Sequence, residues 1–203
     1  MKNWKNEFIN EVNKINDENL RNVALEMTEE IPSYFWTIPA SSSGKYHPDC
    51  DLGEGGLVRH SLMVAKCADD LITSEMFLRD LDINRDIAKI AALFHDSIKN
   101  GLINEDETYS NHTEFEHPRF ASNFVKDFLT NHGVNELIVE MISGAIYTHM
   151  GKWCTDSYGN RKALSKPRTD FEKLIHLADY MASRKYIKGL EEWSEDDSDN
   201  SEV

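Results

Sequence analysis

In the stretch from Ile90 to Lys99, an adjacent histidine and aspartate, His95 and Asp96, end an apolar run that we predict to be helical. On a 3.6-residue period, His95 shares with Ala88 and Ala91 the stripe that should face the core. A buried carboxylate costs several kcal/mol unless a positive group compensates it, and a divalent cation would do so. The alternative is a core histidine that its neighbour merely orients.

Four other predicted helices repeat this pattern, each with one metal-capable side chain on its apolar stripe. They are His60 in residues 57–73, His117 in 117–130, His149 in 134–149 and Asp179 in the helix that follows Thr169. Other histidines do not follow it, since His112 lies in a polar loop, His132 in a turn and His47 before a proline. Five helices are therefore expected to converge on a metal site.

The order of these residues resembles the HD-domain metal-dependent phosphohydrolase superfamily, in the form with two extra histidines between the HD pair and the final aspartate. The resemblance covers roughly Tyr46 to Lys188. It implies that His60, His95, Asp96 and Asp179 hold a first ion and that Asp96, His117 and His149 hold a second.

Imidazole and carboxylate ligands suit two divalent ions, with iron or manganese first and nickel, cobalt, zinc or magnesium as alternatives. Two ions that share a carboxylate lie about 3.5–4 Å apart, close enough to hold one bridging hydroxide as the nucleophile. With Asp96 as the shared ligand, no serine or cysteine nucleophile is needed.

Lys99 follows the pair by three residues and resembles the lysine of the HDxxK form, where it faces the phosphate. It could also be an exposed cation at a helix end. The residues after the pair, Ser97-Ile98-Lys99-Asn100, lack the acids of the family's guanosine tetraphosphate hydrolases and of one nucleotidase branch, and there is no GYP motif. The resemblance therefore favours a phosphodiesterase acting on a nucleotide or short oligonucleotide, with Asp96 and Lys99 as catalytic residues. A nucleotide phosphomonohydrolase and a non-catalytic nucleotide-binding regulator are the alternatives.

Two irregular segments are candidates for substrate contacts, although either could be plain surface loop. Residues 34–56 include the GKYHP and GEGGLVRH segments, which look like those leading into the first metal histidine in some bacterial and phage HD proteins. Residues 150–168 are basic and contain aromatic side chains that could stack on a base. The predicted substrate-binding residues are Lys45, His47, Arg59, Lys99, Lys152, Trp153 and Arg161.

The composition limits the partners. The net charge is −14, and because residues 191–203 hold seven acids and no base, residues 1–190 carry −7. An acidic body is a poor non-specific partner for nucleic acid, but a local basic patch can bind a small anionic nucleotide-type substrate or a short single strand.

Three cysteines without CxxC spacing argue against disulfides and a zinc knuckle, and Cys67 is expected in the core. No stretch is typical of a membrane span or an export signal, so we predict a cytoplasmic protein.

The helical pattern of the sequence predicts an all-α fold of about seven helices in one domain, which positions the site. Residues 1–33 form N-terminal packing helices, with Asp17 as a cap and Pro32 as a stop, and residues 34–190 form the HD core. A short amphipathic piece is expected near residues 75–81, a cap at Asn84 and a capping box at Thr169–Glu172. Residues 191–203 are expected to be a disordered acidic tail.

Overall fold

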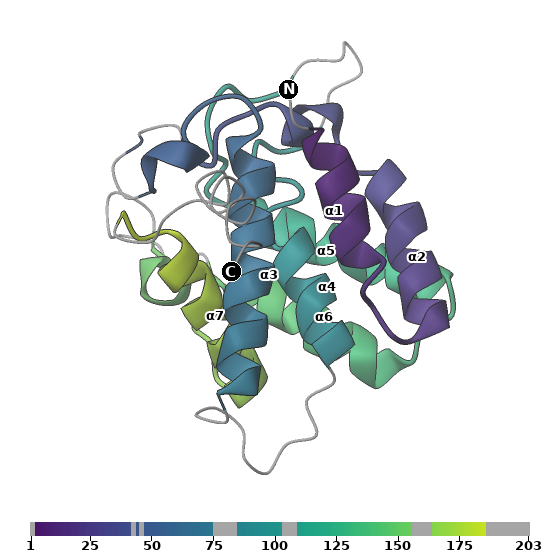
Figure 1. Cartoon of the computed structure of the whole chain (residues 1–203). Coiled ribbons are helices and arrows are strands. Elements are labelled where there is room, and N and C mark those ends of the chain that lie inside the picture. The colour runs from purple at the N-terminus through teal and green to yellow at the C-terminus, as the bar shows by residue number, and fades with distance from the viewer. Residues whose placement is uncertain are drawn as a thin grey trace, which may run out of the picture.

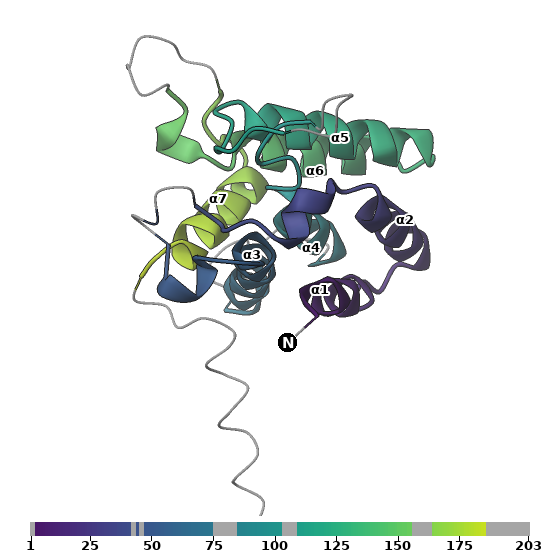
Figure 2. The ribbon, with the colours of Figure 1, turned by 90° about the horizontal axis from the view of Figure 1, so that it is seen from above.

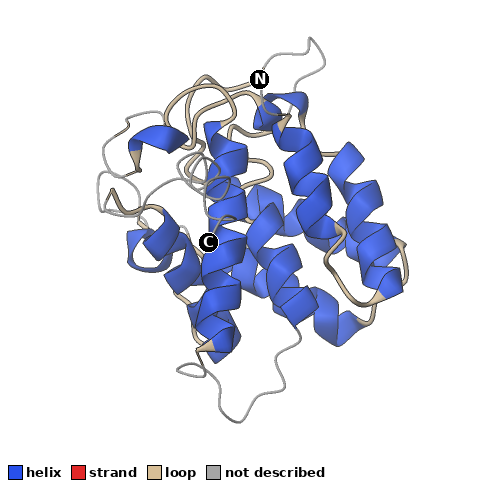
Figure 3. Cartoon of the chain, in the orientation of Figure 1, coloured by secondary structure: helices blue, strands red, loops and turns tan. Residues whose placement is uncertain are grey.

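The computed structural model describes residues 3–41, 44, 47–74, 85–102, 109–155 and 164–185. Over these residues the chain forms seven α-helices and three short 3-10 helices without a β-strand (Figure 1, Figure 3), which confirms the all-α prediction. The elements are α1 Trp4–Val12, α2 Glu18–Glu29, η1 Ser33–Trp36, η2 Asp49–Asp51, α3 Gly56–Thr73, α4 Arg85–Phe94, α5 His117–Asn131, α6 Glu136–Thr148, η3 Gly151–Trp153 and α7 Asp170–Ala182. The piece predicted near residues 75–81, the cap at Asn84 and the acidic tail lie outside the described residues.

The N-terminal helices pack on the rest of the chain through buried aromatic and polar contacts. Phe8 of α1 meets Phe35 and Phe94 edge to face, at centroid distances of 5.7 and 5.4 Å. The Asp17 side chain accepts a hydrogen bond from Leu20 N and caps α2, as predicted. Asp17 N in turn donates to the Asp86 carboxylate of α4 at 2.9 Å. The turn between α1 and α2 is thereby tied to the start of the helix that leads to His95.

Four helices surround the region where the predicted ligands meet. Helix α3 packs against α4 and α7, and α6 packs against the same two helices. Figure 2 shows α5 lying along α6, with α1 and α2 at one end of the molecule. One cluster of buried apolar side chains includes residues from Phe8 in α1 to Ala182 in α7. The site is therefore built between helices that share a single core.

Three of the predicted ligand histidines lie at helix ends. Helix α4 ends at Phe94, so the prediction that this helix ends at His95 and Asp96 was wrong by one to two residues, and residues 95–100 form turns. Neighbouring side chains on a helix point about 100° apart, whereas the turn brings His95 and Asp96 together, 3.4 Å between Nε2 and Oδ2. His117 is the first residue of α5, and His149 caps the end of α6.

The last helix begins with the predicted capping box. The Thr169 side chain accepts from Glu172 N, and the Glu172 carboxylate accepts from Thr169 N. This fixes the start of α7, on which Asp179 faces α3. Among the described residues, no helix is long and apolar enough to cross a membrane.

Candidate metal centre

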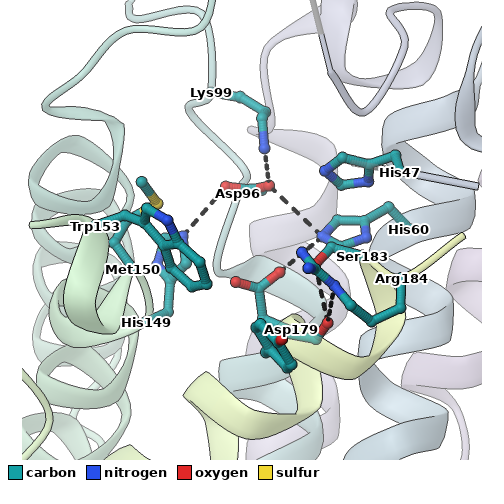
Figure 4. Close-up of a pocket in the computed structure, with 11 residues that line it drawn as sticks. His47, His60, Asp96, Lys99, His149, Met150, Trp153, Asp179, Ser183 and Arg184 are labelled. Carbon is teal, nitrogen blue, oxygen red and sulfur yellow. Dashed lines mark hydrogen bonds and ion pairs between the residues drawn. The ribbon is translucent and has the colours of Figure 1, made fainter. Parts of the chain in front are cut away.

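Five side chains from five segments of the chain converge around Asp96, and Figure 4 shows three of them, His60, His149 and Asp179. Asp96 Oδ1 lies 3.1 Å from His117 Nε2 and 3.6 Å from His149 Nε2. Its Oδ2 lies 3.4 Å from His95 Nε2 and 4.0 Å from His60 Nε2. The two oxygens of one carboxylate thus face two different pairs of imidazoles.

Asp179 completes the side of the cluster that contains His60. Its Oδ1 lies 3.1 Å from His60 Nε2, within hydrogen-bond distance, and 3.8 Å from His95 Nε2. Groups of three potential ligand atoms within 4.8 Å of one another are His60–His95–Asp96, His95–His149–Asp179 and Asp96–His117–His149. The structure therefore brings together all six residues that the sequence predicted as ligands.

Three of the imidazoles are oriented by the backbone just before them. Nδ1 donates to the carbonyl oxygen three residues earlier in His95, His117 and His149, at 2.7, 2.6 and 2.7 Å. A ring whose Nδ1 carries the hydrogen presents the lone pair of Nε2, the arrangement of many metal-bound histidines. All three Nε2 atoms point toward Asp96 or Asp179.

Burial and neighbouring charges keep both carboxylates ionised and His149 neutral. Burial alone would lower the pKa of His95, but the Asp96 carboxylate outweighs it and raises this pKa above its ordinary value. Burial raises the pKa of Asp96, but the Lys99 ammonium and the imidazole of His95 outweigh it and hold the pKa well below its ordinary value. Burial likewise opposes ionisation of Asp179, yet the hydrogen bond from His60 keeps its pKa low. Burial and the neighbouring His95 lower the pKa of His149 to about 3. Ionised carboxylates and a neutral imidazole are the forms that a metal requires.

The donor set fits a divalent metal. Asp96 Oδ1 and the Nε2 atoms of His95 and His117 are buried without a well-formed hydrogen bond among the described residues. Buried polar atoms normally have a partner, and all three atoms point into the cluster. Nitrogen and oxygen donors without a thiolate suit iron, manganese, zinc and related ions. The cluster can therefore hold divalent metal ions.

A cavity of about 250 Å³ opens directly over the cluster. Figure 4 shows Lys99 on one side of Asp96, with Trp153 and Met150 opposite His47 and His60. The lining residues are His47, His60, Asp96, Lys99, His149, Met150, Trp153, Asp179, Tyr180, Ser183 and Arg184.

Comparison with protein families agrees with this geometry. A family model described as HD domain matches residues 57–184, which include all six converging residues. This chain belongs to the HD domain family. Comparisons with curated proteins and with solved structures found no match.

The HD cavity includes only some of the residues predicted to contact substrate. Lys99, His47 and Trp153 line it. Lys152 is exposed, with its Nζ 4.6 Å from the centroid of the Trp153 ring, and does not line the cavity. Two further predicted residues, Lys45 and Arg161, lie outside the described residues.

Arg59 is the predicted substrate contact that the structure places elsewhere. Its Nε donates to Cys50 O at 2.6 Å and its Nη1 donates to Glu54 O at 2.9 Å. The guanidinium also lies over the Trp4 ring. Successive residues of a helix point about 100° apart, so the residue before His60 faces the preceding loop and not the cavity.

His47 differs from the other two histidines that were contrasted with the ligands. Its ring centroid lies 4.7 Å from that of His60, and it lines the cavity. His112 is exposed, and His132, the C-cap residue of α5, contacts Glu26 of α2. His47 therefore lies where a substrate contact is possible, as its inclusion among the predicted substrate-binding residues requires. Grouping it with His112 and His132 as a histidine that does not face the site was wrong.

Four cavity residues were not predicted: Met150, Tyr180, Ser183 and Arg184. Tyr180 stacks on Trp153 at a centroid distance of 5.8 Å, and the Arg184 guanidinium lies 4.2 Å from the Tyr180 ring centroid. Both follow Asp179 within about one and a half turns. Their position after a ligand at the end of a helix was a signal that could have identified them.

His176 supports the turn that carries His149. Its Nδ1 donates to the backbone carbonyl of His149 at 2.6 Å. Gly151 has a φ of +57°, and a Cβ there would overlap the His176 ring. His176 is therefore half-buried and contacts the backbone of a candidate ligand residue.

Proposed function

We propose that this HD domain is a metal-dependent phosphodiesterase that cleaves a nucleotide or a short oligonucleotide with two divalent ions. The observation that carries the proposal is the orientation of Asp96, whose two oxygens face separate pairs of histidines at the base of the cavity. One ion would be held by His60, His95, Asp96 and Asp179, and the other by Asp96, His117 and His149. Bound ions would polarise the phosphoryl group and lower the pKa of a coordinated water.

The residues of the chain orient the substrate above these ions. Lys99 is a largely buried cation that contacts the Asp96 carboxylate and lines the cavity. An ammonium at this position can donate to a phosphoryl oxygen and offset the charge that develops during cleavage. Because the site is enclosed on the side of α4, this interaction is screened less than it would be on the surface.

The opposite wall of the cavity suits a nucleotide better than a simple phosphate ester. Trp153 and Tyr180 form an aromatic pair, and Arg184 lies beside Tyr180. Base stacking on an aromatic side chain is worth about 1–3 kcal/mol in single-strand binders. A guanidinium next to the stack can pair with a second phosphate. The wall therefore offers contacts that a small chromogenic ester cannot use.

A substrate panel tests the proposal. Purified protein would be loaded separately with Mn²⁺, Fe²⁺, Mg²⁺, Ni²⁺ or Co²⁺ and offered chromogenic diesters and monoesters, mono- and dinucleotides and short oligonucleotides, with products identified by mass. We expect metal-dependent cleavage of phosphodiesters. Release of inorganic phosphate from monoesters alone would favour the nucleotide phosphomonohydrolase. Tight nucleotide binding without any hydrolysis would favour the regulator.

A further inference from the structure

The loop before α3 is fixed against the helix that carries His60. The Arg59 side chain donates hydrogen bonds to two carbonyl oxygens of this loop, those of Cys50 and Glu54. The 3-10 turn Asp49–Asp51, which contains Cys50, is closed by a hydrogen bond that Asp51 N donates to Pro48 O at 3.0 Å. The guanidinium that does not reach the cavity therefore holds this turn in place.

Gly56 allows this turn to lie directly on the start of α3. A Cβ at Gly56 would overlap the backbone carbonyl of Asp51, and that carbonyl accepts a hydrogen bond from Ala40 N at 3.0 Å. Gly55 precedes it with a φ of +72°, a conformation that favours glycine. The Asp51 backbone is therefore fixed against Gly56, which lies about one helical turn before His60 in α3.

The Asp51 carboxylate lies between two imidazoles. The residue is 2% exposed, and its Oδ2 lies 3.9 Å from His60 Nδ1 and 3.7 Å from His47 Nδ1. These three atoms are buried without a hydrogen-bond partner among the described residues. A small rotation of either ring, or one bridging water, would satisfy them.

His60 needs such a partner because it differs from the other ligand histidines. Their Nδ1 atoms donate to backbone carbonyls at helix ends. His60 lies within α3, where backbone carbonyls accept the hydrogen bonds of the helix itself. The group behind its Nδ1 is the Asp51 carboxylate, while its Nε2 faces Asp179 and Asp96.

We propose that Asp51 is a positioning residue that orients His60 toward the first metal ion by accepting from Nδ1, and that the same oxygen fixes the neighbouring His47 ring at the cavity wall. This inference rests on the metal site and not on which phosphate ester is cleaved. A carboxylate behind a metal-bound histidine fixes its ring and makes Nε2 a stronger donor, and losing such a partner typically weakens metal binding about 10- to 100-fold.

The test compares Asp51→Asn with Asp49→Asn, an exposed aspartate on the same 3-10 turn. Metal-free proteins would be titrated with Co²⁺, following the d–d absorption and the number of ions bound per chain. We expect Asp51→Asn to weaken one of two binding events about 10- to 100-fold and to change the spectrum of that ion, while Asp49→Asn behaves as the wild type. Asp51→Glu should recover part of the affinity.

Arg59→Lys gives a second route if Asp51→Asn does not fold. This substitution keeps the positive charge and leaves Asp51 in the chain, but a lysine cannot donate to both loop carbonyls as the guanidinium does. The same cobalt-binding event should therefore weaken to a smaller extent. Equal cobalt affinity and spectra in all variants would overturn the inference. A third ion in the wild type that is lost in Asp51→Asn would overturn it too, because His47, Asp51 and His60 would then be ligands of their own site. A wild type that binds cobalt but cleaves no phosphoester would leave it standing and refute only the proposed activity.

Discussion

The two sides of the cavity are built differently. The metal cluster lies between α3, α4, α5, α6 and α7, and its histidines are at most 2% exposed. The aromatic wall consists of Trp153 on a 3-10 turn and Tyr180 and Arg184 near the end of α7, with Trp153 41% exposed. The candidate metal ligands are thus buried among the core helices, whereas the aromatic side chain proposed to contact substrate is partly exposed. Substrate preference can change on this wall without moving the metal ligands.

The largest expected effect is at the centre of the cluster. Asp96→Ala removes the carboxylate shared by both sets of histidines, and we expect activity to fall by more than about 100-fold, as when one preorganised electrostatic contact is lost. His112→Ala is the matched control, because that histidine is exposed in a loop. Activity assays would be run beside metal analysis and thermal unfolding, since removing a ligand also leaves the facing histidines unpaired. Equal losses in the two variants would contradict the assignment of Asp96.

A smaller effect is expected at Gly151, which lies in the chain between His149 of the metal cluster and Trp153 of the aromatic wall. Gly151→Ala would place a Cβ against the His176 ring at a φ of +57°, whereas Gly133→Ala has a similar φ of +71° and open space around it. Both should lose about 1–2 kcal/mol of unfolding free energy for the left-handed backbone, and Gly151→Ala should lose more and weaken metal binding through His149. Chemical denaturation and metal titration measure the difference. Identical behaviour of the two variants would mean that His176 does not support the turn.

The aromatic wall should affect binding more than chemistry. Trp153→Ala removes one face of the stack with Tyr180, and we expect the KM for a nucleotide substrate to rise about fivefold or more, which corresponds to about 1 kcal/mol of stacking. The kcat for a small chromogenic diester should stay nearly unchanged because stacking on Trp153 contributes to binding and not to the cleavage step. Steady-state kinetics on both substrates separates the effects. A matching loss with both substrates would place Trp153 within the reactive part of the site.

The smallest expected effect is far from both regions. Thr169→Ala removes the side-chain cap of α7, which should cost about 1 kcal/mol of unfolding free energy. Thr130→Ala, at an exposed position in α5, is the control and should change stability by less than about 0.5 kcal/mol. Denaturant unfolding distinguishes them. Activity per folded molecule should remain as in the wild type, because Asp179 lies more than two turns further along α7.

The convergence of the candidate ligands could be predicted from the sequence because each one interrupts a helical apolar pattern. His60, His117, His149 and Asp179 occupy positions where the period requires burial, and burial of such groups needs compensation. The helix ends were predicted less accurately, because α4 ends at Phe94, before the predicted end at His95 and Asp96, and α6 ends at Thr148, one residue before the predicted end at His149.

The outer contacts could not be predicted in the same way. Asp51 and His47 lie in an irregular loop, where no period reports which side chains are buried. Arg59 was misassigned because closeness to His60 in sequence does not give closeness in space when the two residues point about 100° apart on a helix. Tyr180 and Arg184 become part of the cavity only when α7 packs beside the turn that carries Trp153.

The most direct test of the central claim is a crystal structure of the Mn²⁺-loaded protein with anomalous difference density measured near the manganese edge. We expect two peaks about 3.5–4 Å apart. One should lie beside Asp96 Oδ2 with His60, His95 and Asp179, and the other beside Asp96 Oδ1 with His117 and His149. A single peak, or metal bound away from Asp96, would contradict the shared-carboxylate site on which the proposed chemistry depends.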